Sequence, residues 1–360
     1  MRIALVAPLF ESVPPRFYGG TERVVANLDR GLTEAGHEVT VFASADSHTV
    51  GHLVPVVDEA LRLRHKPTPD PSIFNFQLLA MVRERASEFD VIHNHHDYWG
   101  LPLSDMVSNP VLTTLHGRLD IPDFHAAYLG YPRSRLISIS DSQRRPLPQL
   151  PWLRTIYHGL DLDHLEFSAA PGSYLAFLGR ISPEKGPHFA VRIAQKAGIP
   201  LKIAAKIEGP ESQDFYDREI RPHVDGHNVE FIGEIGEHEK SAFLGGALGT
   251  LFPIDWPEPF GLVMVESLAC GTPVLGRPLG SVRELLRDGV TGYCDLDIER
   301  LAKRVQDLPA LDRTRCRDWA RDRFSIPRMT EEYLDVYRQL ITQPTHYRRD
   351  LLPTVERLAQ

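Results

Sequence analysis

The sequence predicts an α/β protein built from two Rossmann-like domains, each a doubly wound parallel sheet with helices on both faces. Short apolar runs alternate with amphipathic segments, which is the pattern of strands joined by helical crossovers. The alternation starts at the amino terminus and begins again after residue 170. At 360 residues the chain is also longer than one usual domain. We therefore expect a cleft between two domains, with ligands at the carboxyl ends of the strands.

The first half opens with a predicted buried strand over residues 3–7, because five apolar residues follow one another there. A helix is predicted over 22–34, and the residues on its inward stripe are Val24, Val25, Leu28 and Leu32. A second strand follows at 39–42. The other elements predicted for this half are strands at 91–93, 111–115 and 136–139 and a helix at 76–87.

The second half repeats the pattern with a strand at 174–178 and a helix over 188–197. Further strands are predicted at 202–205, 229–232, 250–252 and 273–275. Stretches containing proline or glycine, at 148–151 and 169–172, separate the two halves. The last predicted element is an amphipathic helix over 329–341, with Tyr333, Val336, Tyr337 and Leu340 on one stripe. No element is predicted for 342–360.

Composition is that of a soluble globular protein, with 42% hydrophobic and 24% charged residues. A formal net charge of −8 argues against nucleic-acid binding, which would need a basic surface. Three cysteines without zinc spacing suit a reducing cytoplasm. The short apolar start leads to Glu11 without a cleavage pattern, and no apolar run reaches the ~20 residues that span a bilayer. We expect a cytoplasmic protein with at most weak peripheral membrane contact.

Two carboxylates, Glu258 and Glu266, lie eight positions apart around a Phe-Gly turn. If residues 259–262 open a helix, Glu266 lies on that helix and Glu258 stays on the loop before it. The N–H groups of Phe260, Gly261 and Leu262 would then attract a phosphate, because a helix start leaves them without partners at its positive end. The two acids could hold hydroxyl groups on either side. Two glutamates near a helix start are common, however, since acids favour first turns.

Two glycine-containing loops could also meet a phosphate. The loop after the strand at 174–178 carries Gly179, Arg180 and Lys185, and two cations five residues apart suit a diphosphate. Gly19 and Gly20 precede the first helix, where paired glycines let the backbone approach a phosphate closely. Each loop also has a plainer interpretation. The loop with Arg180 and Lys185 could be an ordinary basic turn, and Gly19 and Gly20 could simply precede a helix.

Together these segments resemble the retaining glycosyltransferases of family 4, which have the two-domain GT-B fold. The resemblance covers residues 1–341, and its most specific part is Glu258 and Glu266 with the stretch 267–274 that follows. The other matching motifs are Gly179-Arg180 with Lys185-Gly186, Gly280 with Glu284, and Gly19-Gly20-Thr21-Glu22. The family fold implies domains at 1–158 and 159–327, with the C-terminal helix and tail, 328–360, packing back on the first domain.

The resemblance implies a role for each matching position. Arg180 and Lys185 would neutralise the donor diphosphate, Glu266 would bind the ribose hydroxyls and Glu258 would contact the donor sugar. The other implied donor-binding residues are Gly19, Gly20, Gly179, Ile235, Pro259, Phe260, Gly261 and Leu262.

On the other side of the cleft, His116 matches the family's active-site histidine, although a lone histidine after a strand is more often structural. The implied acceptor-side residues are Tyr18, His95 and Arg118. His158 stands where the family usually has asparagine, and Arg277 where it tends to have a small residue.

The resemblance implies a hexosyltransferase that is retaining and metal-independent, needs no cofactor, and is a monomer or homodimer. The expected donor is a nucleoside-diphosphate sugar, UDP-glucose or a similar UDP-sugar, and the acceptor is an unknown hydroxyl on a small molecule, glycan or lipid-linked sugar. One alternative is a GT-B sugar-nucleotide epimerase. A remote alternative is a zinc hydrolase using His93, His95 and Asp97, since 93–97 nearly spells a zinc signature but lacks one histidine.

Overall fold

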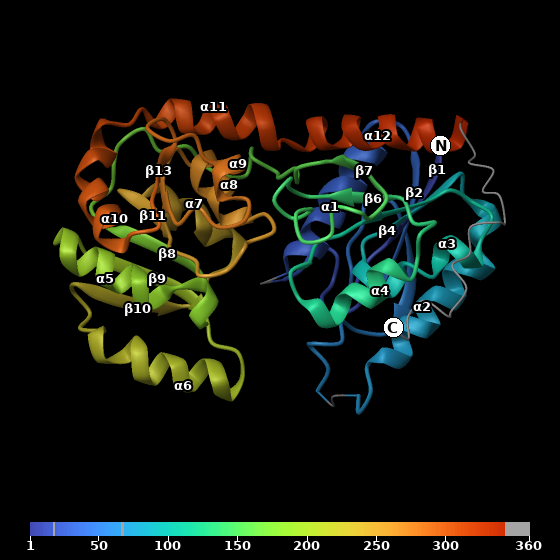
Figure 1. The fold of residues 1–360 in the computed structure, drawn as a ribbon, viewed down its shortest axis with the longest axis horizontal. Helices are drawn as coiled ribbons and strands as arrows, with labels where there is room; N and C mark the ends of the chain where they lie inside the picture. The colour runs from blue at the N-terminus through green and yellow to red at the C-terminus, as the bar shows by residue number, and fades with distance from the viewer. Residues whose placement is uncertain (17–18, 66–67, 343–360) are drawn as a thin grey trace.

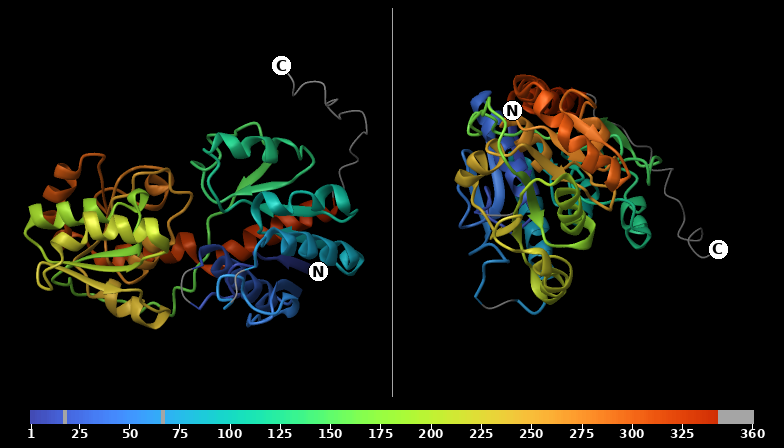
Figure 2. Two further views of the ribbon diagram at one scale, coloured as in Figure 1. Left: turned by 90° about the horizontal axis from the view of Figure 1, so that it is seen from below. Right: turned by 90° about the vertical axis from the view of Figure 1, so that its left-hand side faces the viewer.

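The computed structural model describes residues 1–16, 19–65 and 68–342. It contains two parallel sheets side by side, each covered by helices on both faces (Figure 1 and Figure 2). The seven-stranded sheet has the order β3-β2-β1-β4-β5-β6-β7, and the six-stranded sheet has the order β10-β9-β8-β11-β12-β13. The predicted fold class, two doubly wound α/β halves, is confirmed. The proposed domain boundary between residues 158 and 159 stays a prediction.

The strands of the first sheet are β1 Arg2–Val6, β2 Glu38–Ser44, β3 His52–Val57, β4 Val91–Asn94, β5 Val111–Thr114, β6 Leu136–Ser138 and β7 Trp152–Thr155. Its helices are α1 Gly20–Glu34, α2 Ser72–Glu84, α3 Leu103–Met106 and α4 His125–Leu129. The strands of the second sheet are β8 Leu175–Arg180, β9 Leu201–Lys206, β10 Val229–Gly233, β11 Gly249–Phe252, β12 Val274–Gly276 and β13 Gly292–Cys294. The remaining helices are α5 Pro187–Ala197, α6 Gly209–Glu219, α7 Glu237–Gly245, α8 Leu262–Ala269, α9 Val282–Leu285, α10 Ile298–Arg304, α11 Arg313–Phe324 and α12 Ile326–Thr342.

The central strand and first helix form as their sequences predict. β1 is paired with β2 on one side and β4 on the other, and it is buried beyond its first residue, so a continuous apolar run suits it. The inward stripe of α1 is fully buried against this sheet; its members are Val24, Val25, Leu28 and Leu32. A helix with one apolar face is stabilised mainly by such packing.

Three strands escaped prediction, and all lie at or next to a sheet edge. β3 contains Pro55 and alternates between buried and exposed positions. β7 directly follows the proline-containing stretch that was interpreted as a linker, and β13 has three residues. Prolines and short apolar runs weaken a strand signal, although edge strands tolerate both.

Helix α12 leaves the second half and packs on the first, as the fold class predicts (Figure 1). Tyr333 and Tyr337 are fully buried within the same core cluster as β1 and α1. The two helices approach closely at Gly31, where an added Cβ would lie 2.1 Å from Thr330 Oγ1. Within 1–16, 19–65 and 68–342, no helix has the length and apolar character that crossing a bilayer requires.

Candidate active site

A cavity of about 600 Å³ lies between the two halves and draws its lining from both. The first half contributes the start of α1 and the segment after β5, including Gly19, Gly20, His116 and Arg118. The second half contributes the ends of β8 and β9 and the start of α8; the sequence-predicted residues among them are Gly179, Arg180, Lys185, Ile235, Glu258, Pro259, Phe260, Gly261, Leu262 and Glu266. The structure therefore brings the predicted donor residues of the two halves to one cavity, as expected at the carboxyl ends of parallel strands.

Helix α8 begins at Leu262, the last residue of the predicted start at 259–262. Gly261 precedes it in a left-handed conformation with φ of 90°, which glycine adopts without strain. The first-turn amides, among them those of Leu262 and Val263, have no partner within the helix. They lie in the cavity lining at the positive end of the helix dipole, where an anion is favoured.

Phe260 and Pro259 lie outside the helix, so of the predicted opening residues, 259–262, only Leu262 belongs to it. The Phe260 ring packs against His158 and Phe324, with ring centroids 4.7 and 5.9 Å away. Pro259 has no N–H, and its carbonyl oxygen accepts the Ser140 hydroxyl at 2.7 Å. Both residues line the cavity, but their packing indicates that they hold the loop in place.

Lys185 and Glu258 form an ion pair at 2.6 Å, and both side chains are largely buried. The Lys185 ammonium also lies 4.7 Å from the centre of the Trp256 ring, a cation–π contact. The carbonyl oxygen of Glu258 accepts the Ser281 N–H at 2.9 Å, which fixes the loop. Arg180 lies at the end of β8, 3.5 Å from Glu184. A cation and an acid are thus held side by side at the second half's wall of the cavity.

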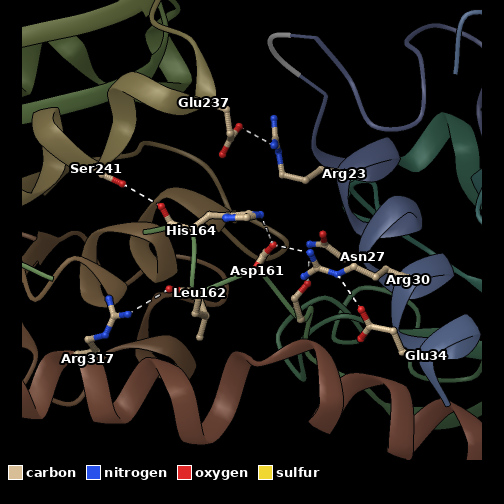
Figure 3. Close-up of polar contacts among 11 residues, drawn as sticks. Arg23, Asn27, Arg30, Glu34, Asp161, Leu162, His164, Glu237, Ser241 and Arg317 are labelled. Atoms are coloured by element: carbon tan, nitrogen blue, oxygen red, sulfur yellow. Dashed lines mark hydrogen bonds and ion pairs between the residues drawn. The ribbon is translucent and has the colours of Figure 1, made fainter. Parts of the chain in front are cut away.

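Glu266 is buried and accepts a hydrogen bond from Lys240 Nζ at 2.7 Å. Lys240 also lies 3.2 Å from Glu237. The other carboxylate oxygen of Glu237 pairs with Arg23 on α1 at 2.5 Å (Figure 3). Glu266, the carboxylate predicted to bind ribose, is therefore linked to α1 of the first half by a series of ion pairs through Lys240, Glu237 and Arg23.

The same face of α1 makes two more contacts across the halves (Figure 3). Asn27 Nδ2 donates to the Gly159 carbonyl oxygen at 2.9 Å, and Arg30 pairs with Asp161 at 2.5 Å. Glu284, a residue of the matching motifs, accepts the backbone N–H groups of Asp141 and Ser142 at 2.8 and 2.7 Å. These contacts hold the halves together around the cavity.

The start of α1 lies against the start of α8 in the lining of the cavity. A Cβ added at Gly20 would lie 3.5 Å from Leu262 Cδ1. Two helix N-termini thus point into one cavity, and their dipoles both favour a negative group between them.

His116 lines the cavity, and His95 does not. His95 is fully buried behind His116, with its Nδ1 3.0 Å from His116 Nε2. The expectation that His95 lines the acceptor side is therefore wrong, because its position just beyond β4 turns it into the interior. Arg118 does line the cavity, paired with Asp120 at 2.7 Å and lying 5.1 Å from the Trp256 ring centre. Tyr18 lies outside the described residues.

The buried histidines are held neutral. Burial lowers the pKa of His116 to about 3 and the pKa values of His95, His93 and His158 well below the usual value. The carboxyl of Asp97 has its pKa raised to about 6 by burial, although it accepts a hydrogen bond from the backbone N–H of His116 at 2.7 Å.

The structure opposes the zinc interpretation of residues 93–97. His93 Nδ1 and Nε2 lie 2.7 Å from Tyr337 Oη and 2.8 Å from Thr114 Oγ1. Both nitrogens of His95 face other histidines, and Asp97 accepts backbone N–H groups. Across 1–16, 19–65 and 68–342, no group of three or more histidine, cysteine or acidic side chains is arranged to hold a metal.

Several cavity residues escaped prediction. Trp256 lies just before the Glu258 motif and could have been noticed as an aromatic beside it. Glu22 is buried, and burial raises the pKa of its carboxyl to about 7. Lys240 gave no local signal, because its partner Glu266 is 26 residues away. Arg277, where the family tends to have a small residue, donates to the Ile254 carbonyl oxygen at 3.0 Å and lies outside the lining.

Comparisons with known proteins agree with this arrangement of two halves. Residues 168–322 match the family model described as glycosyl transferases group 1, and residues 18–164 match the model described as glycosyltransferase family 4. The glycogen synthase of Mycobacterium tuberculosis H37Rv is 28% identical over 377 residues, covering 88% of this chain and 89% of the relative. A phosphatidyl-myo-inositol mannosyltransferase of Mycolicibacterium smegmatis is 28% identical, covering 81% and 80%.

Solved structures share the fold over nearly the whole chain. Sucrose-phosphate synthase from Thermosynechococcus elongatus superposes with a TM-score of 0.78 at 19% identity, covering 95% of this chain and 99% of that one. The Anabaena protein HepE, solved in complex with UDP and glucose, gives 0.73 at 20% identity, covering 94% and 100%. At these identities the likeness is one of fold.

Proposed function

Since the chain belongs to the family 4 group of glycosyltransferases and has their GT-B fold, we propose that it is a retaining, metal-independent hexosyltransferase. The proposed donor is UDP-glucose or a similar UDP-sugar, and the acceptor is a hydroxyl group that enters from the first half. Glycogen synthase is among the relatives, and HepE was solved with UDP and glucose, which supports a glucose donor.

The proposal rests on one observation: two helix N-termini, Lys185 and Arg180 all reach the same cavity. The leaving group of a sugar nucleotide is a diphosphate, so the transition state places new negative charge on a phosphate oxygen. Positive groups fixed before the reaction stabilise that charge without reorganising. We assign Arg180, Lys185 and the amides at the start of α8 to this role, and Gly19 and Gly20 to the opposite side.

The two glutamates are assigned to donor hydroxyl groups. Glu258 is held beside Lys185, so it can accept a hydrogen bond from a sugar hydroxyl next to the phosphate that Lys185 contacts. Glu266 lies about one helical turn into α8, beside Lys240, and can accept a hydrogen bond from the ribose. Ile235 lies in the lining on the same side, where its backbone can contact the base.

For the reaction we propose that the acceptor hydroxyl attacks the anomeric carbon from the same face of the sugar that the leaving diphosphate occupies. The bond between the anomeric carbon and the phosphate oxygen breaks, and its electron pair stays on the phosphate. The acceptor oxygen then bonds to the same face of the anomeric carbon, and its proton passes to the departing phosphate oxygen. Glu258 is paired with Lys185, and Asp97 with backbone amides, which supports a route without an enzyme nucleophile.

The test is nucleotide release from a panel of UDP-, GDP- and ADP-glucose and UDP-galactose, with and without a mixture of sugar acceptors. We expect release from UDP-glucose, no more than a small loss with EDTA, and an α-linked product by NMR, which is retention from an α-linked donor. Strong EDTA inhibition that a divalent ion reverses would overturn metal independence. A β-linked product would overturn retention, and an epimerised donor without glycoside would favour the epimerase.

A further inference from the structure

A continuous hydrogen-bonded chain runs from the cavity to helix α12. His116 Nε2 lies 3.0 Å from His95 Nδ1, and His95 Nε2 lies 3.2 Å from His93 Nδ1. His93 Nδ1 is also 2.7 Å from Tyr337 Oη, and its Nε2 is 2.8 Å from Thr114 Oγ1. Of the three histidines only His116 lines the cavity, where it is partly exposed, and His95 and His93 are fully buried behind it.

Neutral imidazoles in contact constrain one another. Each carries one N–H and one bare nitrogen, and each nitrogen–nitrogen contact needs one hydrogen between the two rings. Fixing the hydrogen on one ring therefore fixes it on the next. Two arrangements satisfy the chain. In one, His116 carries its hydrogen on Nε2 and leaves Nδ1 bare; in the other, the positions are reversed.

The distances at His93 select between the arrangements. Its Nδ1 has two neighbours, Tyr337 Oη at 2.7 Å and His95 Nε2 at 3.2 Å. A bare imidazole nitrogen accepts far better than a phenol oxygen. Hydrogen bonds from an O–H donor are typically shorter than those from an N–H donor, and 2.7 Å lies at the short end of the N–H···O range. The shorter contact is to the phenol, which indicates that Tyr337 donates into a bare His93 Nδ1 and His95 Nε2–H makes a weaker second bond.

The remaining hydrogens then follow along the chain. His93 carries its hydrogen on Nε2 and donates to Thr114, and His95 accepts from His116 through a bare Nδ1. His116 Nδ1, on the edge of the ring away from His95, is buried and has no hydrogen-bond partner among the described residues. Its ring stacks on His158 at 5.1 Å with an interplanar angle of 18°, which fixes its orientation.

We propose that His95 and His93 are positioning residues that hold His116 as its Nε2–H tautomer. The bare Nδ1 is buried in the wall of the cavity, so it would accept a substrate hydroxyl group only after side chains of the wall shift on binding. The hydroxyl of Tyr337, on a helix that starts beside the second half, sets the direction of the chain. The substrate part of this inference rests on the proposed function; the tautomer does not.

The sharpest test compares two buried tyrosines on α12. Tyr337→Phe removes the donor to His93 Nδ1. Tyr333→Phe is its matched control, because the Tyr333 hydroxyl contacts Thr114 Oγ1, at 2.9 Å, and not a histidine nitrogen. Its ring, which the substitution keeps, lies 4.9 Å from the His93 ring and is as buried as that of Tyr337. Two-bond proton–nitrogen NMR on the full chain labelled with ¹⁵N-histidine reports the tautomer, and the spectrum of His116→Gln assigns the His116 signals.

We expect His116 to be the Nε2–H tautomer in the wild type and in Tyr333→Phe, and a mixture of tautomers in Tyr337→Phe. In Tyr337→Phe kcat for sugar transfer should fall ~10-fold, with UDP affinity unchanged, since general acid–base and hydrogen-bonding contributions are commonly of that order or larger. An Nδ1–H tautomer in the wild type, or one unchanged tautomer in all three proteins, would overturn the proposal.

Two further variants separate folding effects from the chain itself. His95→Asn keeps an amide near the position of His95 Nδ1 but cuts the link to His93, and it should also give mixed tautomers. His96→Asn removes a buried histidine outside the chain, whose Nε2 contacts Asn75 at 2.8 Å, and should leave the His116 tautomer unchanged. If the tautomers behave as expected and no sugar is transferred, the proposed function fails and the chain stands.

Discussion

Lys185 Nζ and Glu258 Oε2 lie 2.6 Å apart, so the cation assigned to the diphosphate and the acid assigned to the donor sugar are one ion pair. Neither side chain is held by this contact alone. Lys185 also lies on the Trp256 ring, and the loop that carries Glu258 is fixed by Ser281. A donor sugar attached to its phosphate would meet both groups at once, at the bond that breaks.

We predict that Lys185→Ala and Glu258→Ala each lower kcat/KM for nucleotide release by ~100-fold or more, because each removes a charge fixed near the reacting bond. The fold loss in kcat/KM of the double variant should be smaller than the product of the fold losses of the two single variants, since the two residues act as a pair. The matched control is Lys196→Ala on α5, which breaks an exposed ion pair of 2.7 Å with Glu299 on α10. Near-normal turnover in either cavity variant would contradict the assignment.

The position of Glu258 depends on Gly280. A Cβ at Gly280 would lie 2.2 Å from the Glu258 carbonyl oxygen, and φ at Gly280 is +64°. We predict that Gly280→Ala lowers both the melting temperature and nucleotide release, because the loop must move. Gly289→Ala is the control: its φ is +73°, with no atom within 4 Å of the added Cβ among the described residues. Equal activity in the two variants would show that the contact does not matter.

The contacts of α1 across the halves should bias the protein towards the arrangement described here. Arg23→Ala combined with Arg30→Ala removes two ion pairs between the halves, each worth up to ~1 kcal/mol. We predict a larger radius of gyration in X-ray scattering and a several-fold higher KM for the donor. Glu34→Ala is the control, because Glu34 contacts Arg30 within α1 only. The same scattering curve for all three proteins would argue against this role.

Buried neutral histidines predict acid lability. The pKa of His96 is about 4 and that of His116 about 3 in the folded protein, against about 6.5 when unfolded. Below pH ~6.5 the unfolded chain takes up protons that the folded chain does not, so the free energy of unfolding falls with pH by up to ~1.4 kcal/mol per unit for each such histidine. Urea unfolding at pH 7, 6 and 5 measures the slope, and His96→Asn should reduce it.

Glu22 acts in the opposite direction. Its folded pKa of about 7 lies above the ordinary value of 4.5, so acidification between these values protonates the folded form first and adds stability. Glu22→Gln should therefore steepen the loss of stability between pH 7 and 4.5. A slope equal to the wild type would show that Glu22 is ionised in the folded protein.

Local patterns were enough to predict the α1 stripe and the two facing loops, because apolar spacing and glycines next to charges are visible over a few residues. They were not enough for the histidine chain. The spacing of His93 and His95 looks metal-binding, but the partner of His93 is Tyr337, 244 residues away. Likewise His95 could not be recognised as buried, since the direction of the residues that follow β4 depends on the neighbouring strands and α12.

The packing of α12 has a consequence for how the protein is made. Tyr333 and Tyr337 complete the core around β1, yet they leave the ribosome after every strand of both sheets. The amino-terminal half is synthesised first but lacks part of its interior until α12 has been made. The order in which the two halves reach their final packing should therefore be the reverse of the order in which they emerge.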